Sequence, residues 1–419
     1  MKTSSTSNWQ ILSASFLCMS VAAGIGWFVF PVYMTTIEEE LGTSRALISL
    51  AVVLWAMVGA AFSPVAGGWI DKYGARRVIV AGTLVQIAGT LLLARITSLW
   101  QLYVLFIVAA LASTANTTIP VSIVISRRFD SNRGTAMGIA MLGMGVGGLV
   151  MPIIANVFLE GYGWRGGYNI FAFILMGLLA PIFLWMRPGQ DERLATDGGS
   201  PIDTPAGGTT KTLRSLTAAE AVRTRTFWFL GSGDFLIGIT FTSVTVHMVA
   251  FSTAAGISQA AATTAYGVFL AVNSLGIILF GTAADKIKIK WMMVIAYGAA
   301  AVAWIFLFRL PALVPLYVFA IIFGVTGGGR TALWPLALGQ CFGVAHLGSV
   351  LGWLNIPFMI GNAVGPYMAG YIFDASNSYR LLFLFCIGFS LVAAVFISRM
   401  RDERIRQVEQ AYLVPESSK

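Results

Sequence analysis

Long apolar runs recur along the whole chain and limit what it can fold into. A helix needs about 20 apolar residues to cross a bilayer, and each run is long enough for one crossing. Lipid offers no partners to backbone groups, and a membrane barrel would show short alternating segments instead. The sequence therefore predicts an all-α integral membrane protein with twelve transmembrane helices. The predicted spans are 9–34, 46–70, 76–95, 99–124, 134–158, 166–186, 226–251, 261–283, 291–309, 312–338, 347–370 and 379–398.

Composition excludes several other classes of protein. Of the 419 residues, 57% are apolar and 11% are charged, against about 25% charged in soluble domains. The net charge of +9 lies in short loops rather than on one basic face, so we expect no nucleic-acid partner. Cys18, Cys341 and Cys386 lack the spacing of a disulfide or metal site. The sequence holds no phosphate loop, nucleophile arrangement or metal-ligand cluster, so we expect no enzyme, no metal and no cofactor.

The positions of the basic residues predict the orientation in the membrane. Most of the 27 Lys and Arg residues fall in segments that are cytoplasmic if the N-terminus is inside. The predicted outer segments carry only Arg45, Arg95, Arg165, Arg309 and Arg380. By the positive-inside rule, we expect a multi-pass protein of the inner (plasma) membrane with both termini in the cytoplasm.

The predicted spans form two groups of six that repeat each other. The interval 187–225 separates them, and its centre is rich in Gly, Pro, Ser and Thr, as in flexible linkers. A shift of 214 residues superposes Gly24 on Gly238, Asp71 on Asp285 and Pro152 on Pro366. We therefore expect two pseudo-repeated bundles, with a substrate site between them near the midplane. The predicted divisions are an N-terminal six-helix bundle at 1–186, a cytoplasmic linker at 187–225, a C-terminal six-helix bundle at 226–398 and a cytoplasmic tail at 399–419.

A glycine and charge motif lies between the second and third spans. It reads Gly67-x-x-x-Asp71-Lys72-x-Gly74-x-Arg76-Arg77, and its repeat is Gly281-x-x-x-Asp285-Lys286. Glycine permits close helix approach, and an Asp can meet a neighbouring helix end or an Arg in a contact that forms and breaks between conformations. We expect Asp71, Asp285, Arg76 and Arg77 to act in gating; the alternative is a static loop turn. The motif resembles the loop signature of the major facilitator superfamily.

Further motifs resemble one branch of that superfamily, the monocarboxylate porters and oxalate/formate antiporters. They include Gly24-Ile25-Gly26-Trp27, Ser63-Pro64-x-x-Gly67 and Arg127-Arg128-Phe129. The resemblance implies the major facilitator fold and transport of a small organic anion, with a proton or against another anion. The branch usually places its anion-binding Arg in the eighth span, where this sequence has Ile277. Charge recognition must then come from elsewhere, or the substrate is not a carboxylate.

Arg330, within the tenth span, is the leading candidate for substrate binding. A guanidinium at this depth costs several kcal/mol unless it faces a cavity and has a partner, and its planar fork suits a carboxylate. The 214-residue shift places it opposite Asn116, so we expect both to flank the central cavity. The alternative is an Arg330 that pairs with Asp234 or helix carbonyls and stabilises one conformation.

Other polar residues within the spans are candidates for proton coupling or orientation. Asp234 and His247 share the seventh span and lie about 20 Å apart along a helix, so they form no single cluster. His247 titrates near neutrality and is a candidate for the coupled proton or for substrate binding, against a neutral structural His. For Asp234, a proton relay and an inner-gate ion pair compete. Tyr33 and Asn273 are candidates for neutral hydrogen bonds to the substrate, against simple helix packing.

Together these features predict a secondary transporter rather than an enzyme. The expected partners are a small organic anion, protons or a counter-anion, and the lipid bilayer, and the expected mechanism is alternating access. The first alternative is an antiporter or exporter of an amphiphilic or neutral compound, motivated by the missing eighth-span Arg. The second is a transporter-like sensor that binds ligand without moving it, against which the intact loop signatures argue.

Overall fold

The computed structural model describes residues 3–43, 45–129, 132–186, 214–309 and 312–404. Within these ranges the chain is helical apart from short connections. It divides into two compact units, which comprise the described residues within 1–130 and 139–201 and those within 131–138 and 202–419. The predicted linker 187–225 and tail 399–419 lie outside the described residues except for 214–225 and 399–404. The predicted domain boundaries stay predictions.

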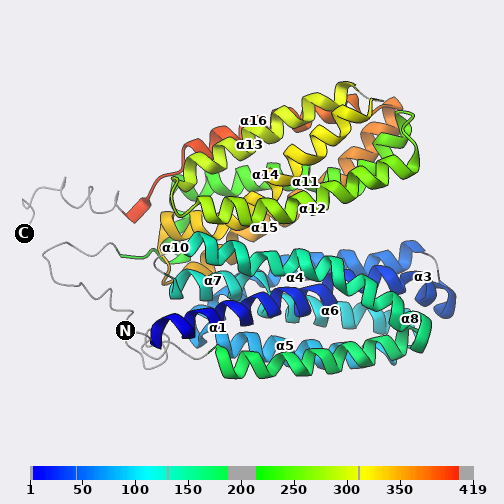
Figure 1. Cartoon of the computed structure of the whole chain (residues 1–419), viewed down its shortest axis with the longest axis vertical. Helices are drawn as coiled ribbons and strands as arrows, with labels where there is room; N and C mark the ends of the chain where they lie inside the picture. Colours follow the sequence, from blue (N-terminus) through cyan, green and yellow to red (C-terminus); the bar gives the residue numbers. More distant parts are fainter. Residues whose placement is uncertain (1–2, 44, 130–131, 187–213, 310–311, 405–419) are drawn as a thin grey trace, which may run out of the picture. The chain divides into compact units, whose positions relative to one another are not determined.

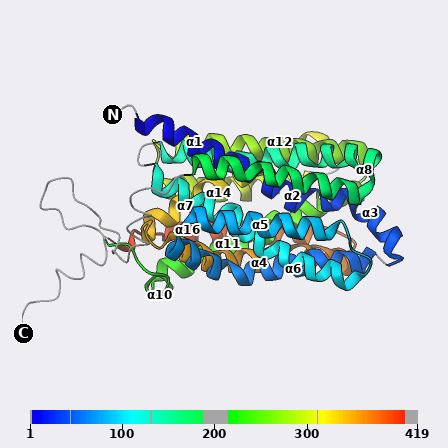
Figure 2. The same ribbon diagram turned by 90° about the horizontal axis from the view of Figure 1, so that it is seen from below.

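The helices of the N-terminal unit run side by side along the unit (Figures 1 and 2). In chain order they are α1 (Thr3–Leu17), the π-helical turn η1 (Cys18–Ala22), α2 (Ala23–Phe28), α3 (Phe30–Leu41), α4 (Arg45–Tyr73), α5 (Ala75–Leu93), α6 (Leu99–Asn116), α7 (Thr118–Arg128) and α8 (Arg133–Trp185). The first turn of α8, residues 133–138, belongs to the second unit.

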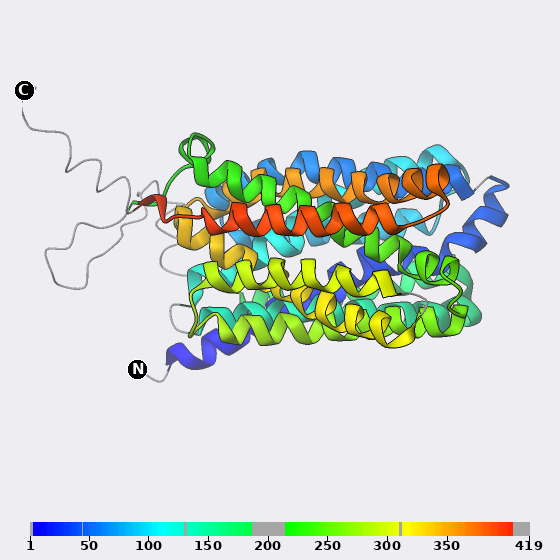
Figure 3. The same ribbon diagram turned by 90° about the horizontal axis from the view of Figure 1, so that it is seen from above.

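The C-terminal unit has the same kind of architecture, as a third view also shows (Figure 3). Its elements are α10 (Ala218–Val222), α11 (Arg225–Ala254), α12 (Gln259–Ala283), α13 (Ile289–Phe306), the 3₁₀ turn η2 (Leu307–Arg309), α14 (Leu313–Phe342), α15 (Leu347–Ser376) and α16 (Arg380–Ser398). Hydroxyl groups cap three of these helices: Thr217 accepts from Glu220 N–H before α10, Thr224 from Phe227 N–H before α11, and Ser258 from Ala261 N–H before α12.

Among the described residues, eleven helical segments are long and apolar enough to cross a membrane. The predicted fifth and sixth spans form one of them, the 53-residue α8, in which Gly163 has φ 66° and ψ 171°. A positive φ suits glycine because it has no Cβ, so the backbone leaves helical geometry between the two predicted spans. The predicted fourth span is interrupted between α6 and α7 at Thr117, whose ψ is −118°. The prediction of a helical membrane protein built from these spans is confirmed.

Close helix approach in the C-terminal unit depends on missing side chains. A Cβ added to Gly328 of α14 would lie 1.8 Å from the Asn273 carbonyl oxygen of α12. A Cβ added to Gly361 of α15 would lie 2.1 Å from the Phe235 carbonyl oxygen of α11. Small residues commonly let membrane helices pack backbone against backbone. The pairs α12–α14 and α11–α15 are accordingly the most extensively packed in this unit.

We expect Gly328→Ala to destabilise the protein by about 2 kcal/mol, because the added methyl group meets backbone that has no room to move. Unfolding of the purified protein in detergent measures the effect. Gly298→Ala in α13 is the matched control, since nothing lies within 4 Å of an added Cβ there. Equal stability of the two variants would contradict the packing argument.

Candidate functional site

Arg330 of α14 and Asp234 of α11 form a buried ion pair. The Arg330 Nε–H donates to Asp234 Oδ1 over 2.8 Å, and the Nη2 group contacts the same oxygen. The side chains are 12% and 1% exposed, respectively. A buried charge requires such a partner, because its desolvation costs several kcal/mol. The pairing with Asp234, one of the alternatives open from the sequence, is therefore present in the structure.

Two aromatic rings lie close to the guanidinium group of Arg330. The Cζ atom of Arg330 lies 3.9 Å from the centroid of the Phe358 ring and 5.5 Å from that of Trp334. A cation over a ring face is attracted by the negative potential of that face. The rings therefore hold the cation in place without neutralising it. Phe358 has no sequence signal that distinguishes it from other aromatic residues in the spans.

The ion pair leaves one polar atom unused. Oδ2 of Asp234 is buried and has no hydrogen-bond partner among the described residues. The Tyr297 hydroxyl of α13 is also buried without a well-formed hydrogen bond within the same ranges, although it lies close enough to Arg330 to interact with it. Buried polar atoms without partners are uncommon in folded proteins. These two atoms keep capacity for a proton, a water molecule or a ligand.

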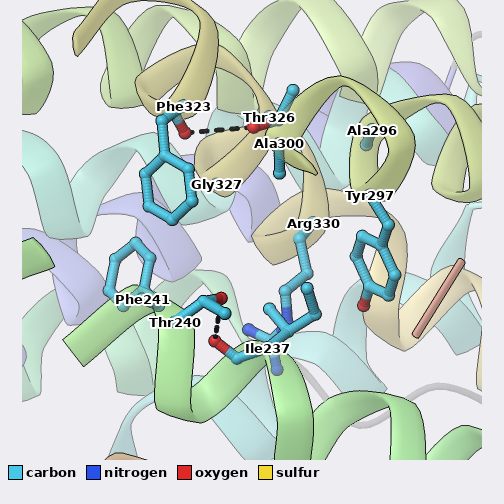
Figure 4. A pocket seen from close by; sticks show the side chains of 10 residues that line it. All are labelled: Ile237, Thr240, Phe241, Ala296, Tyr297, Ala300, Phe323, Thr326, Gly327 and Arg330. Atoms are coloured by element: carbon cyan, nitrogen blue, oxygen red, sulfur yellow. Dashed lines mark hydrogen bonds between the residues drawn. The ribbon is translucent and has the colours of Figure 1, made fainter. Parts of the chain in front are cut away.

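A small cavity adjoins Arg330 (Figure 4). It holds about 20 Å³ of open space, which is enough for one water molecule. Three helices line it with Ile237, Thr240 and Phe241 of α11, Ala296, Tyr297 and Ala300 of α13, and Phe323, Thr326, Gly327 and Arg330 of α14. Space of this size accommodates part of a ligand and not a whole organic acid.

The glycines before Arg330 set its position. A Cβ on Gly327 would lie 2.9 Å from Asn273 Nδ2, and Gly328 lies directly against the α12 backbone. The Asn273 side chain donates from Nδ2 to the Gly324 carbonyl over 3.3 Å. The predicted substrate ligand Asn273 thus ties α12 to α14 near Arg330, and one of its two amide N–H groups is in use.

His247 lies on α11 far from the ion pair. Its Nε2 is 3.1 Å from the Pro366 carbonyl oxygen and its Nδ1 is 3.2 Å from the Tyr379 hydroxyl. A carbonyl only accepts, so Nε2 carries the hydrogen. The two contacts hold the ring between α15 and Tyr379, the residue that precedes α16. The structure keeps His247 and Asp234 apart, as the sequence predicts.

In the N-terminal unit, Asn116 belongs to a buried polar cluster. Its Nδ2 donates to Gln86 Oε1 over 2.6 Å and to Thr83 Oγ1 over 3.4 Å. Gln86 in turn donates from Nε2 to the Ala22 carbonyl over 2.8 Å, at the end of the π-helical turn. Oδ1 of Asn116 is buried without a partner among the described residues. Gln86 was missed by the sequence reasoning, and an amide side chain inside an apolar run was the signal for it.

Tyr33 lies elsewhere in the N-terminal unit. Its ring packs edge-on against Tyr168, with the centroids 5.1 Å apart, and the side chain is fully buried. The hydroxyl sits where Gly167 has no side chain and has no hydrogen-bond partner within the described ranges. Tyr33 therefore keeps an unused donor, but it is not part of the Asn116 cluster of hydrogen bonds.

The two loop motifs use their aspartates differently. Asp71 forms an ion pair with Arg127 over 2.8 Å, in the N-terminal unit. Asp285 accepts from the Gly134 and Thr135 N–H groups over 2.7 and 2.9 Å, in the compact unit that these residues share. This is the anion position at a helix N-terminus, since α8 begins at Arg133. Both modes predicted for the motif, an Arg and a helix end, are present.

The arginines of the first motif also take different positions. Arg76 donates from Nη2 to the Phe183 carbonyl over 3.0 Å, and its Cζ lies 5.4 Å from the Phe183 ring centroid. Arg77 is exposed. These contacts fix Arg76 to the end of α8, whereas Arg77 remains accessible to solvent or lipid headgroups.

The described residues contain no cluster of side chains suited to binding a metal ion. Among the residues that the structure describes, no three His, Cys, Asp or Glu side chains are placed to hold a metal ion. Cys18, Cys341 and Cys386 are free and buried. The chemistry that the described site offers is therefore charge pairing, hydrogen bonding and proton binding.

Comparison with known proteins gives relatives across most of the chain. Human monocarboxylate transporter 12 is 23% identical over 439 residues, covering 98% of this chain and 83% of the relative. The oxalate:formate antiporter of Oxalobacter formigenes is 25% identical over 351 residues, covering 81% and 78%, respectively. The structure of the Escherichia coli fucose:proton symporter has a TM-score of 0.73 at 12% identity, covering 93% of this chain and 98% of that one. It shares the fold.

A family model confirms the resemblance inferred from the loop motifs. The model of the Major Facilitator Superfamily matches residues 16–273 and 229–412. Together these matches cover nearly all the predicted spans of both halves. The protein is thus a multi-pass membrane transporter rather than an enzyme. The chain belongs to the Major Facilitator Superfamily.

Proposed function

We propose that the protein is a secondary active transporter of a small organic anion, coupled to protons and working by alternating access in the plasma membrane. Two relatives are named for monocarboxylates and for oxalate and formate, which supports an anionic substrate. The positions of the Lys and Arg residues support cytoplasmic termini. The observation that carries the proposal is the buried Arg330–Asp234 pair with an unused carboxylate oxygen.

The coupling step that we propose is an exchange of partners on Arg330. Protonation of Asp234 on Oδ2 removes its negative charge and weakens its hold on the guanidinium. A substrate carboxylate then takes the place of Asp234, so the buried cation keeps one anionic partner throughout. Return of the proton to solvent restores the Asp234 pair and releases the substrate. This cycle moves one proton with one anion.

Other residues have supporting roles in this proposal. Within the N-terminal unit, the unused Oδ1 of Asn116 can accept a hydrogen bond from a hydroxyl of a substrate, and the Tyr33 hydroxyl can donate one. Asn273 positions α14 through its bond to Gly324. We assign gating roles to the motif residues Asp71, Arg76, Arg77 and Asp285. The contacts of Asp71, Arg76 and Asp285 join helix ends and loops that alternating access rearranges, and Arg77 lies beside Arg76 with an exposed side chain.

A second candidate function is antiport or export of a neutral or amphiphilic compound. One observation favours it: Arg330 already has a counter-ion in Asp234, so the pair can serve structure alone. A panel of mono- and dicarboxylates in proteoliposomes separates the two functions. Failure of every carboxylate to be taken up would favour the exporter.

We expect Asp234→Asn and Arg330→Gln to separate proton coupling from anion binding. Asp234→Asn mimics the protonated carboxyl and leaves Arg330 free for the anion. This variant should still exchange carboxylate across the proteoliposome membrane. The rate of its uptake driven by a pH gradient should fall at least tenfold. Arg330→Gln should lose at least tenfold of both activities, because no cation remains to bind the anion.

Stability checks that these losses are not misfolding. Each single variant breaks a buried pair and should lower the free energy of unfolding by about 3 kcal/mol. The double variant leaves no buried charge and should recover most of that loss. If the Asp234→Asn variant still accumulates the anion in response to a pH gradient, the Arg330–Asp234 pair does not couple the proton to the anion.

Replacement of His247 by Gln tests the other candidate for the proton. Gln keeps an N–H for the Pro366 carbonyl but cannot titrate near neutrality. We expect the pH dependence of uptake to persist and thermal stability to fall slightly, because both ring nitrogens of His247 are already engaged, one with α15 and the other with Tyr379 at the start of α16. A flattened pH profile would instead assign the coupled proton to His247.

A further inference from the structure

We infer that the cavity beside Arg330 is a subsite for the alkyl end of the substrate and sets its chain length. This inference rests on the proposed function, since it assumes a carboxylate on Arg330. The cavity lies between α11, α13 and α14, inside the C-terminal unit (Figure 4). It follows that residues of α13, which carries none of the charged candidates, determine specificity.

The walls of the cavity offer little to a second charged group. Of its hydroxyls, that of Thr240 donates to the Ile237 carbonyl over 3.0 Å and that of Thr326 to the Phe323 carbonyl over 3.1 Å, each within its own helix. Both hydroxyls are therefore engaged with backbone, as the dashed lines in Figure 4 show. The remaining lining is mainly aliphatic and aromatic. An apolar group gains by entering such a space, whereas a second carboxylate would lose its hydration.

The ion pair adjoins the same space. Arg330 lines the cavity, and its partner Asp234 approaches from α11, the helix that also supplies Ile237, Thr240 and Phe241. An anion that replaces Asp234 therefore binds at the mouth of an apolar pocket. The Tyr297 hydroxyl, buried without a well-formed hydrogen bond within the described ranges, is a second group that can donate to a ligand oxygen, beside Arg330.

Small residues create the space and so limit its size. Ala296 and Ala300 lie one turn apart on α13, and Gly327 of α14 lines the same space. The open volume of about 20 Å³ suits a group the size of a water molecule or a methyl group. The site therefore favours short monocarboxylates with one small apolar group over dicarboxylates and long-chain acids.

The test measures how formate, acetate, propionate and butyrate stabilise the purified full-length protein against thermal unfolding, with chloride at equal ionic strength as the reference. In the wild type, we expect apparent affinity to rise about fourfold from formate to acetate, the gain for one buried methyl-sized group, and to stop rising for longer acids. Ala300→Val should remove the gain for acetate. Ala300→Gly should extend the rise to propionate.

Ala299→Val is the matched control, because Ala299 is the neighbouring residue of the same helix and does not line the cavity. It should keep the wild-type order of affinities. If the affinities of the acids follow the same chain-length order in all variants, the proposed subsite is wrong, whereas the proposal of anion transport is unaffected. Absence of both binding and proteoliposome uptake for every carboxylate would remove the proposed function and the subsite together. If Ala300→Val does not fold, Ala300→Gly alone decides, since it only enlarges the cavity.

Discussion

The charge of Arg330 in the middle of a helix bundle constrains the rest of the C-terminal unit. A guanidinium in this environment must keep an anionic partner, and Asp234 supplies one oxygen at 2.8 Å from Nε. Glycines at positions 327 and 328 bring α14 against α12, and Phe358 covers a face of the cation. The packing thus holds one charge where only a paired charge is stable, and for this reason we propose that a change of partner couples the proton to the anion.

The fold followed closely from the sequence because membrane helices obey few and strong rules. Run length, the positive-inside bias and the 214-residue repeat predict the spans, and the structure adds the turn at Gly163 and the break at Thr117. The Gly163 turn was anticipated only as a gap between two runs. The break at Thr117 had no clear signal, since a backbone angle in one residue of an apolar run leaves little trace in composition.

The candidate site was predictable only in its charged members. Arg330 and Asp234 stand out because charged residues are rare in the spans. The sequence leaves open whether Arg330 binds substrate or pairs with Asp234, and only the geometry shows the pair. Tyr297 and Phe358 were not found, because an aromatic residue in an apolar helix looks the same whether it faces lipid or a cation. The positions of Asn116 and Arg330 relative to each other stay a prediction of the repeat. Gln86 was detectable as a lone amide, and its role in holding Asn116 depends on contacts between helices distant in sequence.

The most direct test of the central claim counts the protons taken up when an anion binds. Purified protein in weakly buffered detergent solution is mixed with a short monocarboxylate, and the pH change is recorded beside infrared difference spectra of protein carboxyl groups. The account predicts uptake of one proton per bound anion, with a new protonated-carboxyl band that isotope editing of aspartate assigns to Asp234. Anion binding at full occupancy with no proton uptake and no change in that band would contradict it.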